Sequence, residues 1–153
     1  MKIKQIMTKK VKCVGPNVKV VEIAYILTKN RIHGIPVVDK GKVLGIITES
    51  DFFIKSLPNL YLPSYIDFLK KAKFAERITK KQKIKTNKLL ESKAKDIMTN
   101  KCVTIKASAN VNELINIFKT KHLFTLPVVD ESDKIVGIIT QADIIKLVKN
   151  INN

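Results

Sequence analysis

Residues 45–51 read Gly-Ile-Ile-Thr-Glu-Ser-Asp, and residues 137–143 read Gly-Ile-Ile-Thr-Gln-Ala-Asp. Two further stretches recur in the same order: Ile-Met-Thr at 6–8 and 97–99, and Pro-Val-Val-Asp at 36–39 and 127–130. The offset between the copies is 91 residues up to Asp130 and 92 residues beyond an insertion in the segment 131–134. An ordered repeat of this kind predicts a chain built from two copies of one structural unit.

Each copy begins with the pattern of a strand followed by a helix. A short β-prone run opens the copies, at 11–14 and at 102–105. Apolar residues then recur at helical spacing, at Val20, Ile23, Ala24 and Leu27 in the first copy and at Val111, Leu114, Ile115 and Phe118 in the second. Asn110 and Glu113 predict a capped start for the second of these helices. Lys19 stands at the matching position of the first copy and predicts a less sharply defined start.

The second part of each copy predicts a hairpin and another helix. In the first copy, the apolar runs 35–38 and 43–48 are joined by turn residues at 39–42. Apolarity that is continuous rather than alternating predicts strands buried on both faces. A helix is expected to begin near residue 49, and its counterpart to run from about 141 to 150. The predicted unit is therefore β-α-β-β-α, a parallel strand pair joined through a helix and followed by an antiparallel hairpin.

The predicted fold class is α/β (α+β), with the two repeats in a pseudo-twofold pair, because one unit of about 50 residues buries too little surface alone. We assign the first repeat, the helical lysine-rich insert and the second repeat to residues 1–56, 57–93 and 94–153, respectively. Within the insert, Ser64 and Asp67 predict a capping box after Pro63. The stretch 80–88 contains five lysines and no acid, which favours a solvated arm between helices.

The composition narrows the class of protein. Twenty-nine Lys and Arg against 13 Asp and Glu give a net charge of +16, and a hydrophobic share of 45% excludes a disordered chain. Two explanations of this charge are equally consistent with the composition. One is a solvated lysine surface, and the other is a surface that attracts polyanions or phosphorylated small molecules. No apolar run approaches the roughly 20 residues of a membrane span, and the first residues do not resemble a secretory signal. We expect a soluble, cytoplasmic protein with no membrane partner.

Cysteine, histidine and nucleophile patterns predict no catalytic or metal chemistry. Cys13 and Cys102 have no CxxC or Cys/His metal spacing, and the only histidines are His33 and His122. Both cysteines fall in predicted strands and are expected to be small buried residues. The sequence has no Gly-x-Ser-x-Gly, no P-loop and no recognisable nucleophile with a base. We expect a protein that is not an enzyme and requires no cofactor.

The Thr-x-x-Asp pattern at 48–51 and 140–143 allows two interpretations. Each lies where a buried strand leads into a helix, a place where ligands bind in open α/β sheets and helix amides favour phosphate. A threonine there can donate to phosphate, and an aspartate can accept both vicinal hydroxyls of a ribose. The same spacing is also a capping box. A cap would have Asp51 accept from the backbone amide of Thr48, leaving nothing free for a sugar.

The repeated stretches together resemble the cystathionine-β-synthase (CBS) domain pair, also called a Bateman module. Those that carry the resemblance are 6–8, 33–39 and 43–51 in the first repeat and 96–99, 125–130 and 135–143 in the second. The resemblance implies a cleft between the repeats that binds an adenosine-containing ligand such as AMP, ADP, ATP or S-adenosylmethionine. The implied ribose ligands are Asp51 and Asp143, and the implied phosphate-facing residues are Thr48 and Thr140. The implied base-facing residues are Cys13, Val14, Ile35, Pro36, Thr104, Ile105, Leu126 and Pro127.

The two implied sites differ in sequence. His33, an implied ligand contact, is matched by Phe124, and Arg31 is matched by His122. The first site should therefore offer more positive charge to a phosphate. Cys13 also stands where the family often has threonine.

Two functional hypotheses follow. The first is a regulatory nucleotide sensor, a homodimer acting on an unknown protein partner, with apolar contacts from Phe52, Phe53, Ile144, Ile145 and Val148. The alternative is a nucleic-acid-associated protein that uses the basic stretch 70–95, with Tyr61, Tyr65 and Phe74 nearby. Phosphate contacts alone would give it salt-sensitive, non-specific binding.

Overall fold

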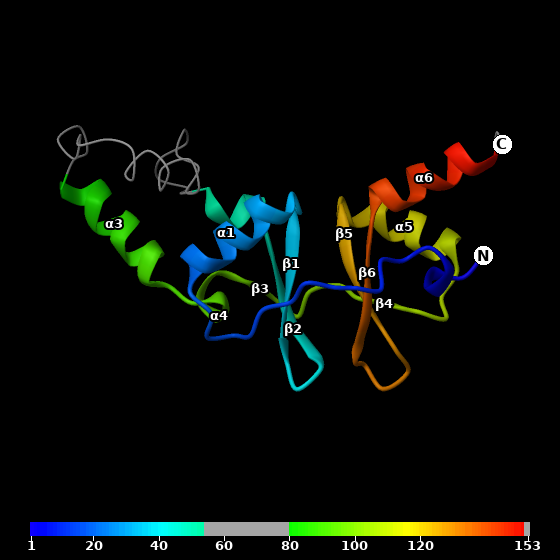
Figure 1. Ribbon diagram of the computed structural model, residues 1–153, viewed down its shortest axis with the longest axis horizontal. Helices are drawn as coiled ribbons and strands as arrows, with labels where there is room; N and C mark the ends of the chain where they lie inside the picture. Colours follow the sequence, from blue (N-terminus) through cyan, green and yellow to red (C-terminus); the bar gives the residue numbers. More distant parts are fainter. Residues whose placement is uncertain (54–79, 152–153) are drawn as a thin grey trace.

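The structure, a computed structural model that describes residues 1–53 and 80–151, consists of two halves standing side by side (Figure 1). Each half contains a three-stranded sheet, with strand order β1-β2-β3 in one and β4-β5-β6 in the other. The strands are β1 (Gly34–Asp39), β2 (Lys42–Thr48), β3 (Thr99–Asn100), β4 (Ile105–Lys106), β5 (Thr125–Val129) and β6 (Ile135–Thr140). The helices are η1 (Ile3–Gln5), α1 (Val20–Asn30), η2 (Glu49–Phe52), α3 (Lys80–Glu91), α4 (Ala94–Ile97), α5 (Val111–Lys121) and α6 (Gln141–Ile151). The predicted mixed α/β class is confirmed.

The first helix of each repeat forms where the apolar spacing predicts it. The side chain of Asn110 caps α5 by accepting a hydrogen bond from the amide of Asn112 at 3.2 Å. Lys19 provides no side-chain cap for α1, as expected. The amide of Val20 instead donates to the carbonyl of Ser92 at 2.9 Å, so a residue just before the second repeat helps to complete the start of α1.

Both predicted hairpins are present. In the first, Gly34 of β1 lies opposite Thr48 of β2, and in the second Thr125 of β5 lies opposite Thr140 of β6. The opening strands are shorter than predicted. Only Ile105 and Lys106 form β4, which pairs in parallel with β5, and the first half has a single parallel bridge between Val14 and Val37.

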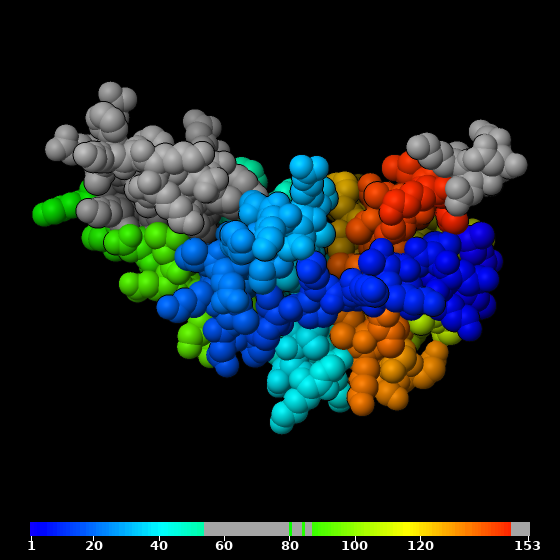
Figure 2. All heavy atoms as spheres, in the orientation of Figure 1, coloured from blue at the N-terminus to red at the C-terminus, as the bar shows by residue number. Residues whose placement is uncertain are grey.

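The halves exchange short segments, which the sequence pattern did not predict. Thr8, at the start of the chain, pairs with Ile138 of β6 in the second half. Thr99 of β3, at the start of the second repeat, pairs with Ile46 of β2 in the first half. Figure 2 shows the N-terminal segment crossing the face of the molecule from one half to the other.

The two hydrophobic cores follow the same exchange. The first core contains Val14, Val20, Ile23, Ala24, Leu27, Ile35, Val37, Ile47, Phe52 and Ala94. The second contains Ile3, Ile105, Leu114, Phe118, Leu126, Val128 and Ile139. Ala94 thus belongs to the first core although it opens the second repeat, and Ile3 belongs to the second core although it opens the first. Each half therefore depends on apolar burial supplied by the other.

Two glycines allow the exchanged segments to approach the strands. A Cβ at Gly45 would lie 2.5 Å from the carbonyl oxygen of Thr99 and 2.9 Å from the sulfur of Met98. A Cβ at Gly137 would collide with the side chain of Met7 and lie 3.2 Å from the carbonyl oxygen of the next residue. A glycine inside a strand commonly marks such a close backbone approach.

Two predictions about individual segments are wrong. Cys13 is exposed, because Val14 beside it takes the inward position, and Cys102 is half-buried. Partial burial still raises the pKa of both thiols. The lysine-rich stretch 80–88 is part of the helix α3, which contacts α1, so it is not an arm between helices, although its described side chains are exposed as predicted. The predicted capping box after Pro63 lies outside the described residues.

Candidate functional site

The candidate site lies where β2 and β6 end and the next helix begins. We call these two strand-to-helix junctions, at residues 48–51 and 140–143, the first and second corners. The turns of both hairpins point the same way in Figure 1, so both corners lie at the opposite edge of the sheets, near the helices. At the first corner, the amide of Thr48 donates to Oδ2 of Asp51 at 2.8 Å. The Thr48 hydroxyl lies 3.3 Å from the same oxygen and 2.8 Å from the hydroxyl of Ser50. Among the described residues, none donates a hydrogen bond to Oδ1 of Asp51.

The second corner has the same bond from the threonine amide to the aspartate, and more of its polar groups have partners. The amide and the hydroxyl of Thr140 both donate to Oδ2 of Asp143, each at 2.9 Å. The ammonium of Lys146 donates to Oδ1 of Asp143 at 3.1 Å. Asp143 is 7% exposed, and a carboxylate so buried requires partners of this kind.

The capping interpretation of Thr-x-x-Asp is confirmed at both corners, but the capping bond engages only one of the two carboxylate oxygens of each aspartate. The expectation that a cap leaves nothing free is wrong for Asp51 as far as residues 1–53 and 80–151 show, because the cap uses Oδ2 and none of these residues donates to Oδ1. At Asp143 the cap and Lys146 together engage both oxygens. Sequence spacing specifies the cap but not which oxygen forms it.

Most residues implied to surround a base have buried side chains. Val14, Ile35, Ile105 and Leu126 belong to the cores, and Pro36 and Pro127 are buried beside them. The amide of Val14 donates to the carbonyl of Pro36 at 3.0 Å, and its carbonyl accepts from Val38 at 2.8 Å. Cys13 is exposed and Thr104 is half-buried, so these two residues remain accessible beside the sheet.

Among the residues that differ between the repeats, His33 has a charged partner. Nδ1 of His33 lies 3.1 Å from a carboxylate oxygen of Glu49, and both side chains are substantially exposed. Such an exposed pair contributes little to stability, but it places a carboxylate beside the positive charge expected at the first site. Arg31 and His122 end α1 and α5 in the left-handed conformation, with φ of 51° and 52°.

Three side chains near the corners were not singled out from the sequence: Ser50, Glu49 and Lys146. The first two lie within the Thr-x-x-Asp segment itself. Lys146 follows Asp143 by three residues on a predicted helix, a spacing at which side chains meet. That spacing was the available signal.

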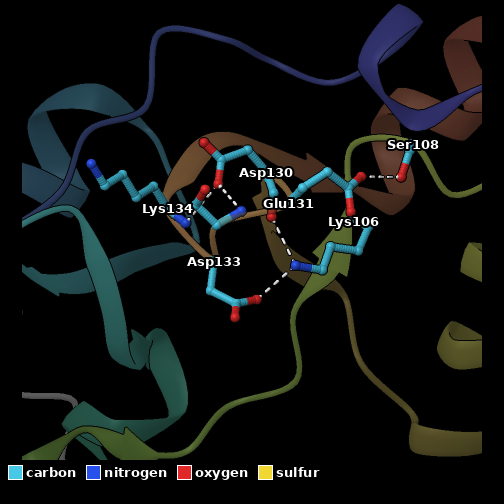
Figure 3. A network of polar contacts seen from close by, with 7 residues as sticks. Lys106, Ser108, Asp130, Glu131, Asp133 and Lys134 are labelled. Atoms are coloured by element: carbon cyan, nitrogen blue, oxygen red, sulfur yellow. Dashed lines mark hydrogen bonds and ion pairs between the residues drawn. The ribbon is translucent and has the colours of Figure 1, made fainter.

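A separate polar cluster shapes the turn between β5 and β6 (Figure 3). Lys106 donates to the carbonyl of Asp130 at 2.8 Å and to the carboxylate of Asp133 at 2.7 Å. The carboxylate of Asp130 accepts the backbone amides of Ser132 and Lys134, each at 2.9 Å. These bonds accommodate the residue inserted in the second repeat. Within residues 1–53 and 80–151, no group of three or more His, Cys, Asp or Glu side chains is arranged to hold a metal.

Comparison with known proteins identifies the class. The family model of the CBS domain matches residues 3–57 and 94–150, and the chain belongs to the CBS domain family as a pair of these domains. An uncharacterized protein of Methanocaldococcus jannaschii is 33% identical over 154 residues, covering 95% of this chain and 90% of the relative.

Two solved structures illustrate the similarity of the fold. One is the CBS domain pair of protein MJ0100 in complex with 5′-methylthioadenosine and S-adenosyl-L-methionine, with a TM-score of 0.69, 25% identity and coverage of 99% of this chain and 98% of that one. The other is CBSX2 in complex with AMP, with a TM-score of 0.72, 21% identity and the same coverage. The chain spans only 55%, 48% and 40% of three further curated relatives. None of the helices in the described part of the chain has the length and apolarity needed to cross a membrane.

Proposed function

We propose that the chain is a regulatory module that binds an adenosine-containing nucleotide in a cleft between its CBS repeats, at one or both Thr-x-x-Asp corners. The observation that carries this proposal is the carboxylate of Asp51. Its oxygen Oδ1 accepts no hydrogen bond from the described residues, and its oxygen Oδ2 lies 3.3 Å from the hydroxyl of Thr48, which in turn contacts the hydroxyl of Ser50. A carboxylate oxygen accepts ribose hydroxyls. A threonine or serine hydroxyl can donate a hydrogen bond to a phosphate oxygen.

The ligand class is supported by related structures. The domain pair of MJ0100 is bound to 5′-methylthioadenosine and S-adenosyl-L-methionine, and CBSX2 is bound to AMP. The feature common to these ligands is adenosine, so we propose adenosine as the recognised part and AMP as the first nucleotide to test. Accessible groups of Cys13 and Thr104 would lie near the base.

The proposed role is regulatory, with no catalytic step. The side chains at the first corner are hydroxyls and a capping carboxylate, which can hold a ligand. A bound nucleotide regulates only to the extent that it prefers one of two states of the module. We propose an interacting protein or a second copy of the chain as the receiver of that change.

A homodimer remains part of the proposal, with one correction to its expected surface. Phe52 is fully buried in the first core and cannot contribute. Ile144 packs partly on the second core, whereas Ile145 on α6 is 67% exposed. Ile145 therefore supports a contact by α6, and Ile145→Glu should shift a dimer to a monomer in sedimentation velocity.

Isothermal titration with AMP tests the binding proposal. Asp51→Asn keeps a carbonyl oxygen for the Thr48 amide but replaces the second acceptor with an NH₂ donor. Hydrogen bonds to charged groups contribute about 1.5–3 kcal/mol, so the affinity of this site should fall about ten- to hundredfold.

A matched control is Asp96→Asn. Oδ2 of Asp96 caps α4 by accepting the amide of Lys93 at 2.8 Å, so the same chemical change is made at another capping carboxylate. This variant should bind AMP like the wild type. Equal affinities of all three proteins, or no binding of AMP, adenosine or S-adenosylmethionine by the wild type, would contradict the proposal.

The nucleic-acid alternative stays a prediction. Its aromatic residues, Tyr61, Tyr65 and Phe74, lie outside the described residues. A salt titration separates the two functions, because binding through many phosphates weakens steeply as salt rises.

A further inference from the structure

The two Thr-x-x-Asp corners share the bond from the threonine amide to the aspartate carboxylate but differ in which of their other polar groups are occupied. If the proposed function holds, this difference predicts which corner binds the nucleotide. The first difference is in the aspartate carboxylates. Both oxygens of Asp143 accept hydrogen bonds from within the chain. Asp51 accepts through one oxygen, and no residue in the described part of the chain donates to the other.

The source of the difference is Lys146. It lies one helical turn after Asp143 on α6, with its side chain 72% exposed and its ammonium 3.1 Å from Oδ1. The corresponding residue of the first repeat, at the 92-residue offset, is Ile54, which has no charge to offer. A ribose hydroxyl approaching Asp143 must therefore compete with an ammonium that is already bound.

The hydroxyl groups differ as well. Thr140 directs its hydroxyl to Asp143 at 2.9 Å, whereas Thr48 has a longer 3.3 Å contact to its aspartate. The first corner has a second hydroxyl, that of Ser50 at 2.8 Å from Thr48. Ala142 occupies the matching position of the second corner. The first corner thus has more donors that can turn toward a phosphate.

We propose that the Asp51 corner is the tight nucleotide site and that Lys146 weakens the Asp143 corner by occupying the carboxylate oxygen a ribose would need. Lys146 acts here as an internal competitor. Because its side chain is mostly exposed, its pairing with Asp143 is in the range of surface ion pairs, up to about 1 kcal/mol. That value corresponds to about a fivefold difference in affinity.

The test uses the amides of Thr48 and Thr140, which donate to the two carboxylates and so report on each corner separately. The ¹⁵N-labelled full chain is titrated with adenosine, which carries no phosphate, and then with AMP. We expect the Thr48 amide to shift at a lower ligand concentration than the Thr140 amide. In Lys146→Gln, the midpoint for Thr140 should move about fivefold lower with adenosine, while that for Thr48 stays in place.

Two variants serve as controls. Lys146→Arg keeps a cation that can pair with Asp143 and should behave like the wild type. Lys119→Gln removes an exposed lysine of α5 and should change neither midpoint.

The outcomes are separable. Equal midpoints for both amides in the wild type, a lower midpoint for Thr140 than for Thr48, or no effect of Lys146→Gln with adenosine would overturn this inference while leaving nucleotide binding intact. Weaker AMP binding at Thr140 in Lys146→Gln would instead make Lys146 a phosphate ligand, which also overturns it. If neither amide shifts with adenosine or AMP, the proposed function itself fails, and the inference with it.

Discussion

Replacing Gly45 with alanine tests whether the exchanged segments hold the two halves together. The new Cβ would lie 2.5 Å from the carbonyl oxygen of Thr99, whereas ordinary van der Waals contact begins at 3.4 Å. The backbone of β3 must therefore retreat by the difference, about 0.9 Å. Overpacking of this kind typically costs about 1–3 kcal/mol. We expect the upper part of that range, about 2–3 kcal/mol, because the obstacle is backbone and the short β3 pairing with β2 is disturbed as well.

The measurement is urea unfolding followed by far-ultraviolet circular dichroism, since the chain contains no tryptophan. For a chain of this size, a loss of 2–3 kcal/mol corresponds to a fall in Tm of roughly 4–12 °C. Gly137→Ala should cost less, because its nearest obstacle is the flexible side chain of Met7 and the carbonyl of Thr8 is 3.2 Å away. Gly15→Ala is the matched control, since nothing lies within 4 Å of its added Cβ.

The expected order of destabilisation is Gly45→Ala, then Gly137→Ala, then Gly15→Ala, the last within about 0.5 kcal/mol of the wild type. If Gly45→Ala were as stable as Gly15→Ala, the close approach of β3 to β2 would not exist in solution. The pairing of Thr99 with Ile46 across the halves would then be refuted, and Gly137→Ala would test the pairing of Thr8 with Ile138 in the same way.

Three further predictions concern the core, a helix cap and an ion pair. Phe52→Ala empties a fully buried position of the first core and should lower the free energy of unfolding in urea by about 3–5 kcal/mol. The control is Tyr25→Ala, at a side chain that is 59% exposed, which should lower it by less than about 1 kcal/mol. Asn110→Ala removes the cap of α5 and should lower the free energy of unfolding by about 1 kcal/mol. Lys19→Ala removes no cap bond and should leave the free energy of unfolding almost unchanged. Equal losses of stability in the two variants would argue against the cap. The hydrogen bond from Lys106, and then its charge, lowers the pKa of the Asp133 carboxyl. Its small contribution to stability is therefore present above the ordinary aspartate pKa of about 3.9 and is lost as pH falls through the lower folded-state value. A carboxyl ¹³C titration should show that low midpoint, with return to the ordinary value in Lys106→Gln; an unchanged midpoint would remove Lys106 as the cause.

Patterns within short stretches of sequence predicted the elements that are formed by contacts between residues close in sequence. The apolar spacing from Val20 to Leu27 specifies the buried face of α1, and the turn at 39–42 specifies the first hairpin, because each depends on residues close in sequence. The segments of Thr8 and Thr99 were missed because they pair through backbone groups with strands far along the chain. Such pairing leaves no side-chain periodicity.

The glycines were the one signal of this exchange in the sequence. Gly45 and Gly137 interrupt runs of branched apolar residues, where glycine weakens a strand unless another backbone must come close. The lysine-rich stretch 80–88 was misinterpreted for a related reason. Its charge favoured a solvated arm, but Leu89 and Leu90 at the end of α3 pack against the first core and support a helix.

The sequence predicted which residues form the candidate site but not which of their polar atoms already have hydrogen-bond partners. Spacing placed Thr48 and Asp51 at the end of a strand, and the structure has them there. Whether a carboxylate keeps a free oxygen depends on atoms that a sequence pattern does not specify. At Asp143 that atom belongs to Lys146.

The crossing of the N-terminal segment affects how the chain would respond to a break in its backbone. Cutting between residues 53 and 80 would yield two pieces, each of which carries a core residue of the other's half, Ile3 in one and Ala94 in the other. Neither piece could bury that residue properly by itself, so the pieces should reassemble when mixed. The protein is thus a natural candidate for a split reporter, in which reconstitution from two separately produced polypeptides signals that they have met.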